Sequence, residues 1–288
     1  MVQVRRLAIV GVGLIGGSFA LAARGAGCVK EIVGTGRSRV NLERAKARGV
    51  IDGDAPLAEA VRGADLVLLA MPVGATAAVL KTIAPHLGTD TVVTDAGSTK
   101  SDVVAAARDA LGGRFARFVP GHPIAGAEQS GVDAARAELF SGKRTVLTPV
   151  AETAADACAT VRDLWRACGA EVHEMTPETH DQVFAAVSHL PHLIAYALVH
   201  DVATHDTADL LFQYAASGFR DFTRIASSHP EMWRDICMAN RTALLAELTR
   251  FESVLAEARR LLEAHDAAGL ERMFDGARRA RDGWLAKR

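Results

Sequence analysis

Residues 7–18, which read LAIVGVGLIGGS, decide the fold. The first four are apolar and partly β-branched, which is typical of a buried strand, and the apolar residues after the glycines predict a helix. Gly11, Gly13 and Gly16 have the G-x-G-x-x-G spacing of a dinucleotide-binding turn, in the strand–turn–helix context that this fingerprint requires. Gly11 permits the tight turn, Gly13 lets the backbone approach a pyrophosphate, and Gly16 lets the helix pack closely on the strand.

The start of that helix supplies groups that bind a phosphate. The N–H groups of its first residues, among them Leu14 and Ile15, have no partner within the helix, and the helix dipole favours an anion there. Some other α/β protein with a glycine-rich turn would show the same glycines. The strand before and the helix after favour dinucleotide binding instead.

A second strand is expected at residues 30–36, and the loop after it indicates the cofactor. NAD-binding folds usually carry Asp or Glu here, about 20 residues after the glycines, to bind the ribose 2′-OH. In this chain the position is Gly36, followed by Arg37, Ser38 and Arg39. Two guanidiniums and a hydroxyl can bind a 2′-phosphate, so the loop favours NADP over NAD. The alternative is an exposed basic loop before the next helix.

Strand and helix patterns alternate through the first half of the chain. Apolar runs of strand length occur at 65–70, 91–95 and 118–119, with helical stretches between them, and two further strands are expected at 143–147 and 170–175. This alternation predicts an α/β Rossmann fold, doubly wound around a mostly parallel sheet, over residues 1–175.

Four residues each follow the end of a predicted strand: Gly13, Pro72, Ser98 and His122. Ligands of doubly wound sheets bind outside the carboxyl ends of the strands, so we expect these four residues to line one crevice. We expect His122 to lie in a loop. A histidine there suits the base that a dehydrogenase needs beside an alcohol carbon.

Beyond Pro177 the patterns are helical, at 179–187, 193–202, 208–212, 221–226 and from 231 onward. They predict an all-α domain over residues 176–288. Six apolar residues alternate there at steps of four and three: Leu244, Leu248, Phe251, Leu255, Ala258 and Leu262. This coiled-coil-like seam predicts a homodimer interface, with packing inside its own domain as the alternative.

Residues 188–192 read SHLPH and place His189 and His192 beside Pro191, which starts or kinks a helix. Two imidazoles near a helix start suit an anionic ligand. A metal site is disfavoured because no third ligand stands at a recognisable spacing, so no metal is expected. The alternative for either residue alone is a packed, hydrogen-bonded histidine.

Arg220 and Arg224 are four residues apart, on one helical face. A surface ion pair with Asp221 is the usual interpretation. The flanking Phe219 and Phe222 are expected instead to draw the segment inward, where a guanidinium needs a carboxylate from a side chain or a substrate.

Composition narrows the function classes. The 288 residues are 49% hydrophobic and 23% charged, with a formal net charge of −1, so disorder is not expected and neither is nucleic-acid binding. Four scattered cysteines fit a reducing compartment, and we expect a cytoplasmic protein. No signal peptide and no apolar run of membrane-spanning length is expected, so neither is a membrane partner.

Five motifs, in order over nearly the whole chain, resemble those of the prephenate dehydrogenase family, including its arogenate-using and cyclohexadienyl relatives. They are GVGLIGGS at 11–18, DAGS at 95–98, GHPIAG at 121–126, SHLPH at 188–192 and DFTRIA at 221–226. The first is generic, whereas the last three together are specific. The resemblance implies a Rossmann domain, an all-helical dimerisation domain, and NAD(P)-dependent oxidative decarboxylation of prephenate to 4-hydroxyphenylpyruvate in tyrosine biosynthesis.

The resemblance also implies roles for individual residues. His122 is implied to be the catalytic histidine, with Ser98 positioning it and the substrate hydroxyl. His192, with His189 beside it, and Arg224 are implied to hold the substrate, Arg224 through a carboxylate.

Two further positions match the family near the substrate. Trp233 matches a position contributed across the dimer in some relatives, and Glu128 matches a polar residue at the pocket mouth. The cofactor loop departs from NAD-using members because it lacks their acidic residue. The chain also ends soon after the helical domain, so we expect no regulatory or chorismate mutase domain.

The sequence alone leaves other substrates and functions open. Prephenate and arogenate differ at one side-chain group, and no residue separates them. A β-hydroxyacid dehydrogenase would use a helical-domain lysine, but Lys287 is the sole lysine after Lys143. A nicotinamide-binding protein without turnover is the remote alternative, which His122, His192 and Arg224 argue against.

Overall fold

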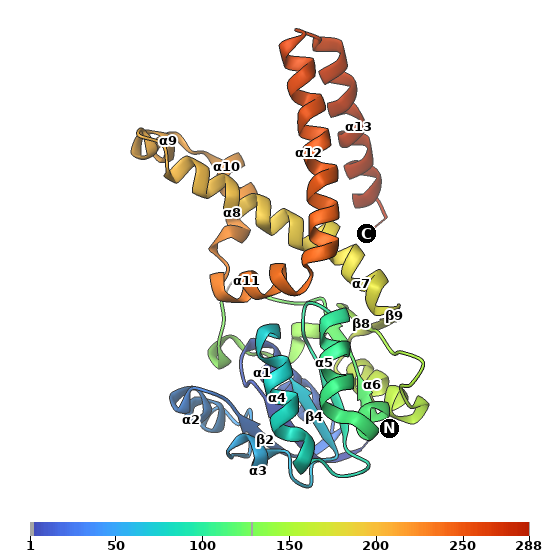
Figure 1. Ribbon diagram of the computed structural model, residues 1–288. Coiled ribbons are helices and arrows are strands. Elements are labelled where there is room, and N and C mark those ends of the chain that lie inside the picture. Colours follow the sequence, from blue (N-terminus) through green and yellow to red (C-terminus); the bar gives the residue numbers. More distant parts are fainter. Residues whose placement is uncertain (1–2, 128, 288) are drawn as a thin grey trace. The chain divides into compact units, whose positions relative to one another are not determined.

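The protein, a computed structural model, is described for residues 3–127 and 129–287. Its chain forms two compact units, Met1–Arg241 and Thr242–Arg288, and Figure 1 shows their elements.

The first unit is built on a six-stranded, all-parallel sheet in the order β3-β2-β1-β4-β5-β6. Its strands are β1 (Val4–Val10), β2 (Val29–Thr35), β3 (Gly53–Asp54), β4 (Leu66–Leu69), β5 (Val92–Asp95) and β6 (Phe118–Val119). This order is that of a dinucleotide-binding Rossmann sheet, which confirms the predicted fold class. Because the order reverses between β1 and β4, a crevice is expected where their carboxyl ends meet.

Helices cover both faces of this sheet, and the alternation of β1 shows it. Leu7 and Ile9 belong to one buried cluster and Ala8 and Val10 to another, because successive side chains of a strand point to opposite faces. The covering helices are α1 (Leu14–Gly25), α2 (Arg39–Ala47), α3 (Leu57–Ala60), α4 (Thr76–Ile83), α5 (Ser101–Leu111) and α6 (Ala155–Ala167). Short 3₁₀ turns join them at Val73–Ala75, Ala84–His86, Gly112–Arg117, Val132–Ala134 and Ala137–Phe140.

A second, three-stranded sheet corrects two expectations. It contains β7 (Gly121–Pro123), β8 (Arg144–Leu147) and β9 (Glu171–Glu174), with β7 antiparallel to β8 and β8 parallel to β9. The last two strands expected in the first half therefore do not extend the main sheet. The expectation that His122 lies in a loop is wrong, since it sits on β7 opposite Val146. A three-residue strand bounded by prolines carries no period-two signal, which is why the sequence suggests a loop.

One long helical run follows the strands, from Pro177 to Ala203. It consists of α7 (Pro177–Phe184), a π-helical turn (Ala185–His189) and α8 (Leu190–Ala203). Pro191 has no N–H to donate and its ring crowds the preceding turn, so the wider turn before it lets the helix continue. His189 and His192 therefore do not sit at a free helix start, which corrects that expectation.

The expectation that no apolar run reaches membrane-spanning length is wrong, because this helical run is long and apolar enough. It has 27 residues, and its most apolar window has a mean hydropathy of 1.4. Length and composition alone are weak support for a membrane span, because core helices share them. The run carries Asp181 and buried histidines that hydrogen bond to other parts of the first unit.

Three more helices and a 3₁₀ turn complete the first unit: α9 (Ala208–Tyr214), α10 (Ser217–Thr223), Arg224–Ser227 and α11 (Pro230–Ala239). The second unit is a pair of helices, α12 (Arg241–Glu263) and α13 (Ala267–Leu285). Asp266 caps α13 by accepting the Gly269 N–H at 2.8 Å, and a Cβ at Gly269 would lie 2.5 Å from the Leu261 side chain. Leu255 and Leu262 of the predicted seam are 53% and 62% exposed in the single chain.

Candidate active site

A cavity of about 1030 Å³ opens at the carboxyl ends of β1, β2 and β4. Seven of the predicted cofactor residues line it: Gly11, Gly13, Gly36, Arg37, Ser38, Arg39 and Pro72. Leu14, Ile15, Gly16 and Ser98 are not among its described lining residues. The crevice that topology predicts is therefore present where the strand order reverses. Of the four residues expected to line it, Gly13 and Pro72 do so, whereas Ser98 and His122 are not among its described lining residues.

The glycine-rich turn fits a dinucleotide pyrophosphate. Gly11 has φ +97°, and a Cβ there would lie 2.6 Å from the Ala70 carbonyl oxygen, whereas a Cβ at Gly16 would collide with the Gly11 carbonyl. Around a Cβ at Gly13, by contrast, no atom lies within 4 Å. The N-cap of α1 is Gly13, which makes no side-chain cap, and the first turn has no acidic residue. No side-chain cap or carboxylate at the start of α1 therefore competes with an anionic ligand.

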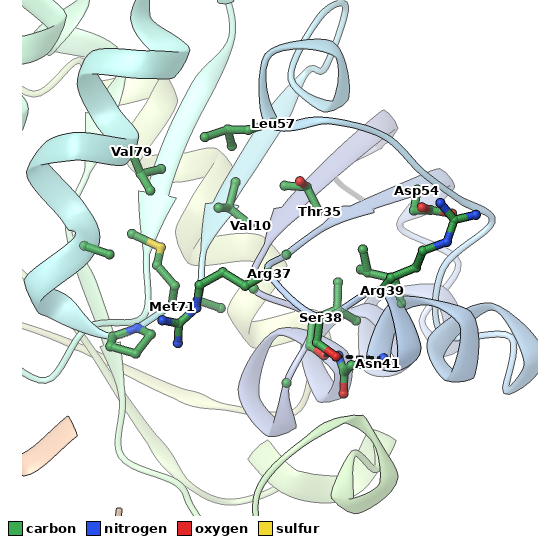
Figure 2. A pocket seen from close by; sticks show the side chains of 18 of the residues that line it. Val10, Thr35, Arg37, Ser38, Arg39, Asn41, Asp54, Leu57, Met71 and Val79 are labelled. Atoms are coloured by element: carbon green, nitrogen blue, oxygen red, sulfur yellow. Dashed lines mark hydrogen bonds between the residues drawn. The ribbon is translucent and has the colours of Figure 1, made fainter. Parts of the chain in front are cut away.

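The two arginines of the loop after β2 point in different directions, as Figure 2 shows. The Arg37 side chain extends toward Met71 across the cavity, and no ion-pair partner for it is found among residues 3–127 and 129–287. Arg39 extends toward Asp54 and pairs with Glu43 at 3.1 Å, with 89% of its side chain exposed. Arg37 is therefore the guanidinium better placed to bind a ligand in this cavity.

Helix α11 adds charged residues to the rim of the same cavity that sequence analysis missed. Glu231, Arg234 and Asp235 line it, and Arg234 pairs with Asp235 at 2.6 Å. A Cβ on Gly74 would lie 2.5 Å from the Asp235 carboxylate, so this glycine lets the turn after β4 approach α11 closely.

His122 is held by a histidine from α7. Its Nδ1 lies 2.9 Å from Nε2 of His180, and the Phe184 ring packs on both imidazoles, with centroids 4.9 and 4.4 Å away. Burial lowers the pKa of His122 well below its usual value, and the positive charge of Lys100 lowers it further. His122 is therefore neutral at physiological pH, as a base must be.

His180 is in turn fixed by its neighbour Asp181. The His180 Nδ1 lies 2.9 Å from the Asp181 carboxylate, which also accepts the backbone N–H groups of Lys100 and Ser101 at 2.8 Å each. Burial opposes ionisation of Asp181, but the hydrogen bonds from His180, Ser101 and Lys100 hold the pKa of its carboxyl below the usual value. The ionised, buried carboxylate of Asp181 therefore accepts a hydrogen bond from His180.

A buried ion pair fixes the strand ends that carry His122 and Ser98. Lys100 is fully buried, pairs with Asp95 and donates to the Gly121 carbonyl at 2.7 Å. The Asp95 carboxylate accepts the N–H groups of Gly97 at 2.8 Å and of Gly121 at 3.0 Å. The loop after β5 and the start of β7 are thereby tied together.

No hydrogen bond joins Ser98 to His122 in the described part of the chain; the partner of His122 is His180. Burial lowers the pKa of His189 to about 4, while Asp181 and the Ser98 backbone oppose that shift. The Asn240 amide, 3.0 Å from His189 Nδ1, holds this ring.

A second pocket, of about 860 Å³, contains the other predicted substrate residues. His192 and Arg224 line it together with Arg136 and Arg220, and none of its described lining residues is acidic. His192 donates its Nδ1–H to the Ser188 carbonyl at 2.8 Å and stacks on Trp233, with ring centroids 3.5 Å apart. Phe222 is 55% exposed, so the expectation that it is drawn inward is wrong.

Aromatic contacts extend from this pocket to His189. His192 stacks on Trp233, and the Trp233 ring lies 6.1 Å from the His189 ring. The segment that begins with β7 reaches the same pocket, because Gly126 lines its wall. Glu128, predicted at the pocket mouth, lies outside the described residues.

Comparison with known proteins gives the family. The model of the prephenate dehydrogenase nucleotide-binding domain matches residues 19–174, and that of the prephenate dehydrogenase dimerization domain matches residues 176–276. The chain belongs to the prephenate dehydrogenase family. Because the family acts by dehydrogenation, the protein is an oxidoreductase that uses a nicotinamide cofactor.

Three relatives show how far the likeness extends. A cyclohexadienyl dehydrogenase of Zymomonas mobilis is 39% identical over 98% of this chain and 96% of the relative. A prephenate dehydrogenase structure from Aquifex aeolicus, in complex with hydroxyphenyl propionate and NAD+, has TM-score 0.89 and 36% identity over 96% of this chain and 98% of its own. A Synechocystis arogenate dehydrogenase structure has TM-score 0.80 and 30% identity over 97% and 99%.

Several residues of this site were not predicted from the sequence, namely Lys100, His180, Asp181 and Asn240. Two weak signals could have pointed to some of them. Lys100 stands two residues after Ser98, and His180 and Asp181 lie in a run of five polar residues, 178–182, just before the apolar part of the helical pattern. Their function depends on contacts across 58 to 81 residues of sequence, which no local pattern contains.

Proposed function

We propose that this chain is a homodimeric prephenate dehydrogenase with a preference for NADP+. Residues 1–175 bind the nucleotide, and residues 176–288 bind substrate and form the dimer. The observation that carries the proposal is the segment that begins with β7, which holds the neutral His122 and, four residues later, lines an arginine-rich pocket with Gly126. The exposed seam residues Leu255 and Leu262 support the dimer.

The chemistry of prephenate suits His122. Prephenate has a ring carbinol and, across the ring, a quaternary carbon that bears a carboxylate. A nicotinamide bound in the first cavity would supply the hydride acceptor for the carbinol carbon. His122 accepts the hydroxyl proton, and the ketone that forms is conjugated through the ring to the quaternary carbon. The bond to that carboxylate then breaks and its electron pair moves through the ring to the ketone oxygen, which takes the proton back from His122. Carbon dioxide leaves, and the ring becomes aromatic.

The second pocket suits the two carboxylates of prephenate. Arg136, Arg220 and Arg224 supply three guanidiniums, which form strong, charge-assisted hydrogen bonds with carboxylates. His192 adds a neutral imidazole, because burial lowers its pKa and the charge of Arg224 adds to that effect. A pocket with this charge favours a dianionic substrate.

Arogenate is the second candidate substrate, because of His192. Its Nδ1–H is donated to Ser188, so Nε2 carries a lone pair. That lone pair can accept a hydrogen bond from the ammonium group that distinguishes arogenate from prephenate.

Absorbance at 340 nm tests the proposal, with prephenate or arogenate and NADP+ or NAD+ in all four combinations. We expect the highest kcat/KM for prephenate with NADP+. A higher value for arogenate would correct the substrate, and a higher value with NAD+ would correct the cofactor. No absorbance change in any combination would overturn the proposed function.

Arg224→Ala is expected to raise KM for the substrate by about 10- to 100-fold, with a smaller effect on kcat. A hydrogen bond between charged groups contributes roughly 1.5–3 kcal/mol, and this contact is expected in both ground and transition states. Arg108→Ala serves as control, since Arg108 pairs with Glu152 outside both cavities. An unchanged KM for Arg224→Ala would argue against a carboxylate contact.

Arg37→Ala is expected to raise KM for NADP+ by about tenfold or more and to leave KM for NAD+ nearly unchanged, because only NADP+ carries the 2′-phosphate. Arg39→Ala is the matched control and should have the smaller effect, since Arg39 pairs with Glu43 and points toward Asp54. Equal effects of Arg37→Ala on the two cofactors would contradict this role.

A further inference from the structure

We infer that His180 and Asp181 are positioning residues that hold His122 in the tautomer with its proton on Nδ1, so that Nε2 is free to accept the substrate proton. This inference rests on the proposed function only for the identity of that substrate. The arrangement of donors and acceptors in the free protein carries it.

Asp181 is the one residue among His122, His180 and Asp181 whose hydrogen-bonding role is fixed by its chemistry. Its carboxylate already accepts two backbone N–H groups, from Lys100 and Ser101, each at 2.8 Å. An ionised carboxylate can only accept hydrogen bonds. The His180 Nδ1, 2.9 Å away, must therefore donate, and it carries the proton of that ring.

The next link follows from the neutral state of His180, because burial lowers the pKa of this ring even though the hydrogen bond to Asp181 opposes the shift. A neutral imidazole with its proton on Nδ1 has a lone pair on Nε2. This Nε2 lies 2.9 Å from Nδ1 of His122, so His122 must donate there. The ring of His122 then has its own lone pair on Nε2. One charge on Asp181 thus sets the tautomers of two histidines in succession.

Packing holds the side chains of His122, His180 and Asp181 in place. His180 has no exposed surface and Asp181 is 6% exposed, so water does not compete for their hydrogen bonds. The Phe184 ring contacts both imidazoles, and the Asn240 amide donates to the Asp181 backbone carbonyl at 2.7 Å. The geometry is that of a base oriented by a second group which is oriented by a carboxylate.

Two substitutions of His180 separate hydrogen bonding from packing. In His180→Gln the amide oxygen can take the place of Nε2 and accept from His122. In His180→Phe the ring shape stays but the acceptor is lost, so His122 is free to move its proton to Nε2. Phe184→Leu is the packing control, because it loosens both rings and leaves the acceptor in place.

The first measurement is the tautomer of His122 in the free protein, by long-range ¹H–¹⁵N correlation on histidine-labelled samples. His122→Asn identifies its signals. We expect the proton on Nδ1 in the wild type, in His180→Gln and in Phe184→Leu, and a shift to Nε2 in His180→Phe. A proton on Nε2 of His122 in the wild type would overturn the inference.

The second measurement is turnover. His180→Phe is expected to lower kcat by between about 10- and 10⁴-fold, the upper end being the loss when a histidine base is held in the wrong tautomer, with little change in KM. His180→Gln should remain within about tenfold of wild type. Equal losses in both variants, or a wild-type kcat in His180→Phe, would refute the positioning role. The expected tautomers without turnover of either substrate would contradict the proposed function and leave this inference standing.

Discussion

Replacing His122 with asparagine is expected to lower kcat by about 10²–10⁴-fold while the dissociation constant for the nicotinamide cofactor stays near the wild-type value. That range is what a positioned general base contributes. Asparagine keeps a polar side chain of similar size but offers no nitrogen lone pair to accept the proton. His122 is not among the residues that line the nucleotide cavity, so binding of the cofactor should not change.

Steady-state kinetics and a cofactor titration by fluorescence check this result. His173→Asn is the matched control, because His173 lies in the same row of the three-stranded sheet, beyond Val146, and is exposed. Near-normal turnover in His122→Asn would remove His122 from the mechanism. Weaker cofactor binding together with lost turnover would indicate damage beyond the loss of a base.

Lys100→Met is expected to lower the free energy of unfolding by about 3–5 kcal/mol, which is the effect of removing one partner from a buried ion pair. The substitution leaves the Asp95 carboxylate buried without its countercharge and removes the donor to the Gly121 carbonyl. Methionine retains most of the volume, so the loss reflects charge rather than a cavity.

Urea denaturation followed by circular dichroism measures the change. Lys81→Met is the control, since Lys81 pairs with Asp109 at 3.1 Å while both side chains are more than half exposed. Such surface pairs contribute at most about 1 kcal/mol. A loss for Lys100→Met no greater than that of Lys81→Met would mean that the pair contributes nothing to stability.

The sequence was sufficient for the Rossmann sheet because each of its parts has a local signal. The glycines at 11, 13 and 16 define a turn of known geometry, and apolar runs such as residues 66–69 can only be buried strands or helices. The position of the crevice followed from topology, since the carboxyl ends of parallel strands share one edge. For the same reason the place of the cofactor loop with Arg37 follows from the sequence alone.

The arrangement around His122 could not be found in this way. Its strand has three residues, and its partner His180 comes 58 residues later, on a different element. Which atoms meet there depends on how α7 packs on α5, where the Asp181 carboxylate accepts N–H groups at the start of α5. Likewise, Arg37 and Arg39 are equivalent in sequence, and only the direction of each side chain separates them.

The π-helical turn at Ala185–His189 has a consequence for how this site tolerates change. The turn lies between His180 and Asp181, which orient the base, and the pocket residue His192. All three residues belong to the helical run from Pro177 to Ala203. Each residue in a helix advances the angular phase by about 100°. A π-helical turn closes i→i+5 hydrogen bonds and so contains one residue more than an α-helical turn. Losing one residue from this turn would therefore restore an α-helical turn and keep His192 near its present phase, whereas a deletion between His180 and the turn would rotate His192 away from its pocket. Changes of length within this stretch should therefore be confined to the turn itself.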